Sequence, residues 1–555
     1  MWRNSKWIFL LLAVCAVGFA FRKPAEKYFD IAKSLDIFAT LFKEVNAYYV
    51  DEVDPEKLVR HGIDGMLESL DPYTDFIAEE ELETFRITTT GQYGGIGALI
   101  GVVNDKAVIT HPYKGFPAQK AGVRVGDEII SVDGKKVQGK STAYISSLLK
   151  GQPRTEVEVV VRRARQKENI TVKIRRERIV ITNVAYAGML TSEIGYIRLD
   201  DFTPGAGREV AQALSALKGQ GATKVVLDLR ENLGGLLQEA INVVNIFIPK
   251  GQDVVFTKGK VDDWNKSYKT LNQPVDVEIP LAVLVSEESA SAAEIVAGAI
   301  QDYDRGVLIG KKTYGKGLVQ TTRELAYNSQ LKVTTAKYYI PSGRCIQAVD
   351  YTHRKDDGSV ERVADSLKAS FRTSSGRTVY DGGGLDPDVL MPDEYVGTVT
   401  AAVVNSGLVF EFATQYCAEN PQPSLEDFRL SDKEYAEFQD FLRANEFRYT
   451  TSLERNAKQL SEAAQQERYI KELDASIKQL AEKINAVKAT DFTRFKGEMT
   501  QILEEQIGFH YALHEGLAAV SLQRDATVSE AQKVLRDSVR YAKILSDPDG
   551  APPKP

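Results

Sequence analysis

Two short segments of the chain contain residues that could perform nucleophilic catalysis together. In the first, an apolar strand ending at Val285 is followed by a turn of small residues and then by a predicted helix over 292–301. Ser291 lies at the start of that helix, where free backbone N–H groups stabilise negative charge on oxygen. A serine at this position is often only an N-cap, so the segment indicates catalysis only if a base lies nearby.

The second segment, 313–320, contains a lysine that could be this base. The chain has five histidines, none of them in a recognisable catalytic setting, and it has no GxSxG or HExxH motif. Lys316 stands between two glycines, and Gln320 follows four residues later. A lysine can act as a base only when it is neutral, which requires burial and an uncharged hydrogen-bond partner such as an amide. Taken alone, a Gly-Lys-Gly segment is typical of a solvated loop.

Together these segments resemble the carboxy-terminal processing proteases, also called tail-specific proteases. In that family a Ser-Ala-x-Glu serine precedes a Gly-Lys-Gly lysine by 25 residues, and a glutamine follows the lysine by four; the same spacings occur here. The resemblance implies that Ser291, rather than Ser286 or Ser289, is the nucleophile, because Ala-Ala-Glu follows it. It also implies that Lys316 is the base and that Gln320 positions this lysine.

A third segment, 228–235, resembles the family's Asp-x-Arg-x-Asn-Pro-Gly-Gly motif and departs from it at Leu233. The resemblance implies an oxyanion hole built from the amide of Gly234 or Gly235, with the choice left open, and from the amide of Ala292. Further similar segments place the match over about residues 35–400 and in the family's order; they are 70–73, 338–347 and 383–388.

The region before the core resembles a PDZ domain. Such domains bind a peptide C-terminus as an added strand, and a glycine-rich loop of backbone N–H groups holds the terminal carboxylate. The segment 93–100 supplies both features, although its glycines alone could form an ordinary β-turn. The glycine-punctuated pattern over 117–134 favours the PDZ interpretation. The predicted carboxylate loop and receiving strand contain Gly94, Gly95, Ile96, Gly97, Ala98 and Leu99.

The chain of 555 residues is long enough for several domains. We predict a multidomain α/β protein: a layered α/β serine-protease core with an inserted PDZ domain, N-terminal helices and a helical C-terminal region. The expected parts are a signal peptide or anchor (1–22), an N-terminal helical region (25–88), the PDZ domain (89–175), the protease core (176–400, with contributions from 60–88), a helical C-terminal domain (401–545) and a disordered tail (546–555).

The N-terminus predicts export. Basic residues precede an apolar run over 7–21, which is the pattern of a secretory signal and is short for a membrane span. We therefore expect a bacterial periplasmic or cell-envelope protein, with a membrane tether through 7–21 left open.

Partners and cofactors are constrained by charge and by the metal-binding residue types. The net charge of −7 gives no electrostatic support for nucleic-acid binding. His510 and His514 lie four residues apart on a predicted helix and could bridge a metal, but no third ligand is evident beside them and there is no CxxC motif. We expect neither a metal nor a cofactor.

The C-terminal region contains one heptad-like stretch. Apolar residues recur at spacings of three and four over 470–487. The stretch is short for a free coiled coil, so packing between helices of the same chain is the favoured interpretation, and a homo-oligomer contact is the alternative.

These features predict a serine endoprotease that cleaves envelope proteins near unstructured C-terminal tails, with a PDZ domain that captures or gates the substrate. The alternative is a scaffold protein in which the protease core is silent; turnover of a disordered substrate separates the two.

Overall fold

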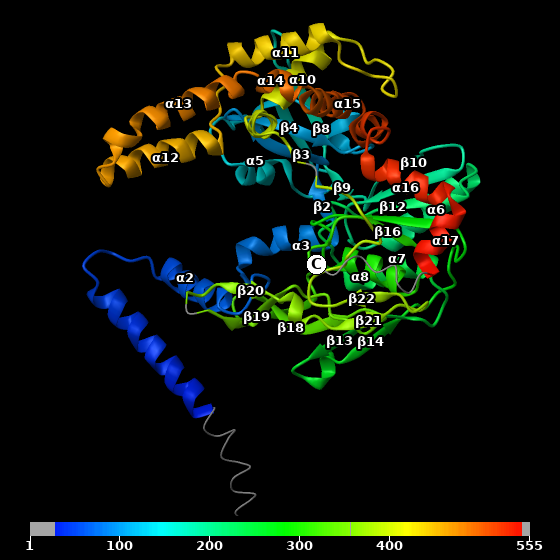
Figure 1. The fold of residues 1–555 in the computed structure, drawn as a ribbon. Helices are drawn as coiled ribbons and strands as arrows, with labels where there is room; N and C mark the ends of the chain where they lie inside the picture. The colour runs from blue at the N-terminus through cyan, green and yellow to red at the C-terminus, as the bar shows by residue number, and fades with distance from the viewer. Residues whose placement is uncertain (1–27, 356, 394, 547–555) are drawn as a thin grey trace, which may run out of the picture. The chain divides into compact units, whose positions relative to one another are not determined.

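The computed structural model describes residues 28–355, 357–393 and 395–546, so the predicted signal segment and all of the predicted C-terminal tail except Ser546 lie outside the described residues (Figure 1). The chain divides into two compact units. The smaller contains residues 1–76 and 331–333, and the larger contains 77–330 and 334–555. No helix among the described residues is both long enough and apolar enough to span a membrane.

The smaller unit contains the predicted N-terminal helices. A helix over 28–48 exposes many apolar side chains, including those of Phe29, Leu35 and Phe38. The next helix, α2 (Pro55–Glu68), begins where Asp54 accepts hydrogen bonds from two first-turn amides and where proline takes the first helical position.

The PDZ region forms an antiparallel sheet in the order β3-β4-β5-β7-β8, with β6 paired to β5. Helix α5 (Thr142–Leu149) starts at Ser141, whose hydroxyl accepts the Tyr144 amide. Strand β3 forms one edge of this sheet, which leaves its outer side open to an added strand. The strands are β3 (Ala98–Val103), β4 (Lys106–Pro112), β5 (Glu128–Val132), β6 (Lys135–Lys136), β7 (Glu156–Arg162) and β8 (Ile170–Arg175).

The protease core is a layered α/β structure around a sheet in the order β10-β11-β12-β15-β16-β23. The pairs from β11 to β23 are parallel, and β10 runs antiparallel to β11. Such a sheet needs cover on both faces, which agrees with its nearly continuous apolar strands. The strands are β10 (Val184–Met189), β11 (Ile194–Leu199), β12 (Lys224–Asp228), β15 (Leu281–Val285), β16 (Val307–Gly310) and β23 (Val389–Leu390).

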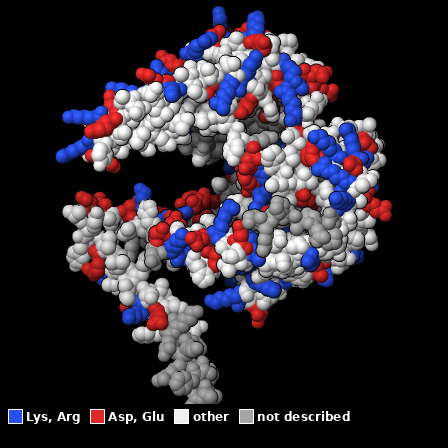
Figure 2. Space-filling view, viewed as in Figure 1, with Lys and Arg blue, Asp and Glu red and all other residues white. Residues whose placement is uncertain are grey.

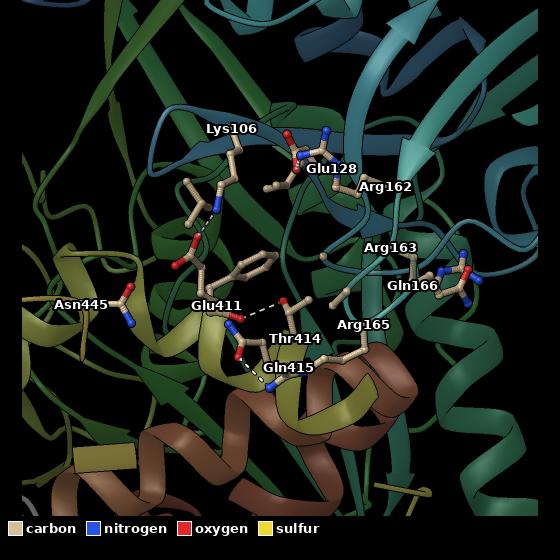
Figure 3. A pocket seen from close by; sticks show the side chains of 15 residues that line it. Lys106, Glu128, Arg162, Arg163, Arg165, Gln166, Glu411, Thr414, Gln415 and Asn445 are labelled. Atoms are coloured by element: carbon tan, nitrogen blue, oxygen red, sulfur yellow. Dashed lines mark hydrogen bonds and ion pairs between the residues drawn. The ribbon is translucent and has the colours of Figure 1, made fainter. Parts of the chain in front are cut away.

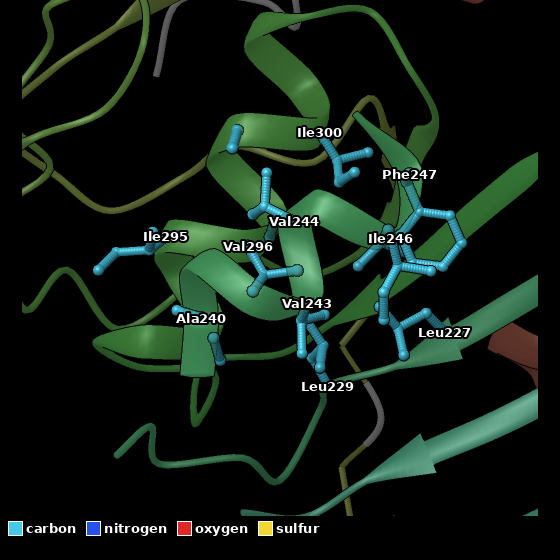
Figure 4. Close-up of a cluster of buried hydrophobic side chains, with 14 of the residues drawn as sticks. Leu227, Leu229, Ala240, Val243, Val244, Ile246, Phe247, Ile295, Val296 and Ile300 are labelled. Carbon is cyan, nitrogen blue, oxygen red and sulfur yellow. The ribbon is translucent and has the colours of Figure 1, made fainter. Parts of the chain in front are cut away.

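Alternate residues of these strands pack against different helices. Leu227 of β12 joins α6 (Ala206–Gly219), α7 (Leu237–Phe247) and α8 (Ala292–Asp302) in the largest apolar cluster (Figure 4). Its neighbour Val226 points to the opposite face, which α16 (Ala526–Arg536) covers.

The predicted helical region 401–545 therefore divides into two parts. Helices α9 (Thr398–Asn405), α10 (Leu408–Glu419), α11 (Asp432–Ala444) and α15 (Lys496–Ser521) enclose an apolar core of their own, whereas α16 and α17 (Ser538–Ser546) pack against the protease sheet. The division follows from the apolar face of α16, whose side chains are buried together with the apolar strand residues on that face of the sheet: Val528, Ala531, Val534 and Leu535. Lys, Arg, Asp and Glu side chains are interspersed over the outer surface of the helical domain (Figure 2).

The heptad-like stretch lies on α13 (Ile470–Lys488), which forms an antiparallel hairpin with α12 (Ser452–Gln466) (Figure 1). Ile477 is buried in the hairpin, whereas Leu480 and Val487 remain exposed. Packing within the chain thus accounts for part of the seam.

A second sheet of the core contains β13 (Asp253–Gly259), β14 (Lys266–Lys269), β17 (Leu318–Glu324) and β18 (Gln330–Tyr339). Strand β13 pairs with β14 and with residues 336–339 of β18, and β17 pairs with β18. Strand β17 begins two residues after Lys316, so this sheet supports the segment that follows the predicted base.

The PDZ and helical domains meet around a polar cavity of about 400 Å³ (Figure 3). Lys106 of the PDZ domain pairs with Glu411 of α10 (Leu408–Glu419) at 3.1 Å, and Arg165 pairs with Glu419 at 2.5 Å. The Arg165–Glu419 pair is substantially exposed and therefore contributes little to stability, whereas Glu411 is mostly buried beside an exposed Lys106.

Candidate active site

Ser291 occupies a strained position between β15 and α8. Its φ of 55° and ψ of −113° are unusual for a residue with a side chain, and α8 begins at the next residue. Its hydroxyl makes no capping hydrogen bond to the first turn of this helix, in the part of the chain that the structure describes. Strain of this kind often marks a functional residue. The geometry thus favours a reactive serine over a simple N-cap.

The two neighbouring serines are engaged in holding the turn. Ser289 is fully buried; its hydroxyl donates to the Leu229 carbonyl at 2.7 Å and accepts the Ser286 amide at 2.9 Å. The Ser286 hydroxyl donates to the Arg230 carbonyl. Both serines therefore fasten the nucleophile turn to the loop after β12, in agreement with the choice of Ser291 as the candidate nucleophile.

Glu294 joins the serine segment to the lysine segment. It is completely buried, and its two carboxylate oxygens accept four hydrogen bonds. Oε1 accepts the Thr313 hydroxyl at 2.6 Å and the Gly315 amide at 2.8 Å. Oε2 accepts the Lys316 amide at 2.9 Å and the Ser291 amide at 3.0 Å. One side chain thus fixes the backbone of both candidate catalytic residues.

Burial raises the pKa of Glu294 to about 6, while the four donors act in the opposite direction. All four neighbours donate, so only the ionised carboxylate can accept all of them without a competing proton. The state that holds the two segments together is therefore the charged one.

Tyr338 provides a second link between the same two segments. Its hydroxyl lies 2.6 Å from the Lys316 carbonyl and 3.1 Å from the Ser291 carbonyl. Gly315 has a φ of +88°, and a Cβ there would lie 2.4 Å from Ala348 Cβ. The loop around the lysine is consequently closely packed, rather than a solvated turn.

Gln320 lies on β17 with its amide oriented by a neighbouring strand. Its Nε2 donates to the Thr334 hydroxyl at 3.2 Å. Both Gln320 and Lys316 are partly buried. The contact gives Gln320 a defined orientation, and its action on Lys316 stays a prediction.

Asn232 organises the predicted oxyanion loop. The side chain is buried, its Nδ2 donates to the Leu199 carbonyl at 2.7 Å and its Oδ1 accepts the Gly234 amide at 2.8 Å. Its backbone carbonyl accepts the Ala290 amide at 3.0 Å. Asn232 therefore connects the end of β11, the glycine pair and the nucleophile turn.

The glycine pair lies directly against the nucleophile. A Cβ on Gly234 would be 2.7 Å from Ser291 Cβ and 2.9 Å from the Ala292 nitrogen, and the φ of Gly234 is +99°. Gly235 lies against the Phe202 backbone. Within the described residues, the amides of Gly235 and Ala292 donate to no other group, whereas Gly234 donates to Asn232.

The loop after β12 is also tied to the C-terminal helices. Arg230 pairs with buried Asp228 at 2.6 Å and with Asp525 at 2.7 Å. Burial would raise the pKa of Asp228, but Arg230 and the Tyr196 hydroxyl hold it below its ordinary value. Asp525 also caps α16 by accepting the Val528 amide. The helix that covers the sheet therefore contacts the oxyanion loop through one ion pair.

The predicted carboxylate loop is shorter in the structure than in the prediction. Gly94 and Gly95 lie in β2 (Gln92–Gly95), which pairs with β9 (Glu177–Val180). A Cβ on Gly94 would lie 2.2 Å from the Gly151 carbonyl oxygen, so close backbone packing explains this glycine. Only Ile96 and Gly97 connect β2 to the edge strand β3, in which Ala98 is partly buried and Leu99 is exposed.

The histidines and cysteines take structural positions. His510 is bonded to Thr414 and to the Gln506 carbonyl, and His514 packs edge-on against His111 with ring centroids 4.9 Å apart. Among the described residues, no group of three or more His, Cys, Asp and Glu side chains could hold a metal ion. Both cysteines in this part of the chain, Cys345 and Cys417, are free thiols.

Three protein-family models match successive parts of the chain. The model of peptidase family S41 matches residues 193–353, the PDZ domain model matches 108–163, and the model of the C-terminal helical domain of probable PDZ-proteases matches 399–535. A carboxy-terminal-processing protease of Bartonella bacilliformis is 37% identical over 325 residues, which cover 58% of this chain and 74% of that protein. The chain belongs to the carboxy-terminal-processing protease family.

Other similar proteins include a probable CtpA-like serine protease of Staphylococcus aureus (strain COL), which is 38% identical over 56% of this chain. The match spans 62% of the length of that relative. A solved photosystem II D1 C-terminal processing protease is 29% identical and covers 65% of this chain and 93% of its own, with a TM-score of 0.34. A PDZ domain of a Vibrio cholerae carboxy-terminal protease in complex with peptide is 27% identical, covers 16% of this chain and 99% of its own, and has a TM-score of 0.16.

Two important positions of this family member cannot be assigned from the sequence motifs alone. Glu294 and Asn232 lie inside the motifs that indicate the serine and the glycine pair, but neither was given a role. The available signal was a polar residue within an otherwise apolar or glycine-rich stretch. Such residues are buried only with partners, and the partners here come from other segments.

Proposed function

We propose that this protein is a serine endoprotease that cleaves protein substrates near their C-terminal tails, with Ser291 as nucleophile and Lys316 as general base. The observation that carries the proposal is the shared hydrogen bonding of the Ser291 and Lys316 amides to the buried Glu294 carboxylate. A buried carboxylate that fixes both backbones gives the two side chains a reproducible relation, which nucleophilic catalysis requires.

The reaction begins with neutral Lys316 accepting the proton of the Ser291 hydroxyl while its oxygen attacks the scissile carbonyl carbon. The tetrahedral intermediate collapses, the C–N bond breaks, and the lysine returns the proton to the leaving amine. A water molecule then attacks the acyl-enzyme by the same proton route, which releases the new C-terminal carboxylate and restores Ser291. Gln320 positions the lysine from β17.

The oxyanion of the intermediate is stabilised by backbone amides. Ala292 donates from the first turn of α8, where amide groups and the helix dipole favour negative charge. We assign the second donor to Gly235, because the Gly234 amide already donates to Asn232. Gly234 would then serve close packing against the nucleophile.

The PDZ domain captures the substrate tail. The Ile96–Gly97 turn supplies amides for the terminal carboxylate, and β3 receives the tail as an added strand. The enzyme acts in the cell envelope on proteins with unstructured C-terminal tails, in keeping with the basic start and apolar run over 7–21.

Purified full-length variants test the dyad on an unfolded substrate protein. Ser291→Ala and Lys316→Ala should each lower kcat/KM by at least about a thousandfold, because each removes a group that reacts. Lys260→Ala replaces an exposed lysine and is the matched control; it should cleave at the parent rate. Undiminished cleavage by either dyad variant would overturn the proposal, as would a parent protein that binds tails but never cleaves them.

A further inference from the structure

A groove of about 930 Å³ lies between the PDZ domain and the strand that follows the catalytic lysine. One wall is α3 (Leu82–Thr90), the second is the start of β2, and the third is the turn over 325–329 with the adjoining ends of β17 and β18. Its volume is at the upper end of the range for ligand sites. The groove therefore has room for a peptide segment.

The walls of the groove are joined to each other. Asn328 Nδ2 donates to Glu79 Oε1 at 2.9 Å, which ties the turn after β17 to the short helix that precedes α3. Tyr93 and Gly94 line the opposite end, where β2 leads into the proposed carboxylate turn. The groove thus extends from the end of β17 to the residues of β2 that precede the proposed carboxylate turn.

The charges of the groove differ between its two ends. At the end formed by α3 and the β17 turn, it is lined by Glu79, Glu83 and Glu324, with Arg86 as the opposing charge. At the PDZ end, the cations lie beside the lining residues. Lys150 Nζ is 5.8 Å from the centre of the Tyr93 ring, and the Arg178 guanidinium donates to the Gln92 side chain. This polarity suits a peptide with its carboxylate at the PDZ end and positive side chains farther upstream.

The length of β17 shows how many residues of an extended tail are needed to reach the groove. Seven strand residues span roughly 23 Å, so an extended tail of about seven residues reaches from the region of Lys316 to the groove. A tail held by its carboxylate in the PDZ domain and cleaved at Ser291 would therefore lay its intervening residues along the groove.

We propose that this groove binds the part of a substrate tail between the scissile bond and the C-terminal carboxylate, and that it selects tails with Lys or Arg in that part. The inference deepens the proposed protease function and rests on it for the direction of the tail. The occupant is chosen by charge complementarity with Glu83 and Glu324 and because Tyr93 and Gly94, which precede the proposed carboxylate turn, line one end of the groove.

Binding can be measured without cleavage in the full-length Ser291→Ala protein. Fluorescent peptides that share one C-terminal sequence carry two Lys, two Gln or two Glu residues, moved stepwise through the upstream positions. The Lys peptide should bind about fivefold more tightly than the Glu peptide at its best position, because exposed charge pairs give modest gains. This ratio should fall toward one at high salt.

Two sets of substitutions show whether the groove causes the preference. In the Ser291→Ala background, Glu83→Gln with Glu324→Gln should reduce the Lys-over-Glu ratio to about one while leaving the affinity for the Gln peptide unchanged. Glu80→Gln is the control, since Glu80 is exposed on the short helix next to α3 but does not line the groove. Equal binding of Lys and Glu peptides at every position would overturn the inference, and so would a preference that persists in the double variant.

The failure of this inference can be distinguished from the failure of the proposed function. If the protein with Ser291 intact cleaves none of the tails but the charge preference in binding depends on Glu83 and Glu324, the protease proposal is wrong and the inference about the groove is supported. If all tails are cleaved and bound equally, the inference about the groove is wrong and the protease proposal is supported.

Discussion

The two regions that a protein substrate would meet are held in opposite ways. The candidate catalytic segments are joined by buried hydrogen bonds to Glu294 and Asn232, within one domain. The PDZ domain meets the helical domain through exposed ion pairs such as Arg165–Glu419 around a polar cavity. Buried polar networks are costly to break, whereas exposed pairs contribute little. The candidate catalytic segments are therefore held together more strongly than the PDZ domain is held to the helical domain.

The largest effect is expected for Glu294→Gln, which disrupts the buried hydrogen bonds of the candidate catalytic segments. The new NH₂ group must face two N–H or O–H donors that the carboxylate oxygen accepted, and these buried donors then lose their partner. We expect kcat/KM to fall about a hundredfold and the melting temperature to drop. Peptide binding by the PDZ domain should be unchanged, measured by fluorescence anisotropy.

Glu288→Gln changes an exposed glutamate of the same turn and is the matched control. If Glu294→Gln cleaves substrate as fast as this control, the carboxylate does not hold the site.

A somewhat smaller effect is expected for Asn232→Ala. The substitution removes the side chain that links the Leu199 carbonyl to the Gly234 amide, so the glycine pair loses its fixed position against Ser291. We expect kcat to fall about tenfold to a hundredfold with little change in KM, because the ground-state peptide contacts lie elsewhere. Steady-state kinetics on a reporter peptide provide the measurement; a change in KM alone would assign Asn232 to substrate binding.

The pH dependence sharpens the comparison further. The pKa of Glu294 is about 6, so the carboxylate that accepts four donors is lost as the pH falls through 6, and activity should decline there by several-fold. The contribution of Glu294 to the free energy of unfolding depends on pH in the opposite direction. Because the folded-state pKa lies above the ordinary value of 4.5, the contribution of this group is fully present below pH 4.5 and is lost as the pH rises through 6.

Activity and melting temperature measured between pH 4.5 and 7.5 should therefore change in opposite directions for this group, and Glu294→Gln should remove its part of both slopes. A stability contribution from Glu294 that rises with pH over this interval would contradict the assignment of its buried, raised pKa.

The smallest effect is expected where the domains meet. Replacing Glu419 and Glu515 together by Gln removes the partners of Arg165 and Lys114, both in exposed pairs. The free energy of unfolding should change by less than about 1 kcal/mol, and cleavage of a short reporter peptide should stay at the parent rate. Denaturant unfolding and reporter kinetics provide the two measurements; a large loss in both would mean that the contact is part of the rigid site.

Much of the organisation could be predicted from sequence. The type of each domain and the candidate serine, lysine and glycine pair follow from motifs in which residue types recur at fixed spacings, and the helices over 28–48 and 292–302 follow from local periodicity. Local patterns specify such features because turns, caps and helix faces depend on residues close in the chain.

Only the tertiary structure decided which polar groups meet. Glu294 takes its partners from Thr313, Gly315, Lys316 and Ser291, and Arg230 meets Asp525 almost 300 residues away. Two further features cannot be predicted from the sequence: the packing of α16 against the sheet and the short turn at Ile96–Gly97. Helix packing determines the first and strand pairing determines the second. The sequence by itself determined the candidate reactive groups; the packing of distant segments decided how they are held, because a buried polar side chain is defined by partners that spacing does not reveal.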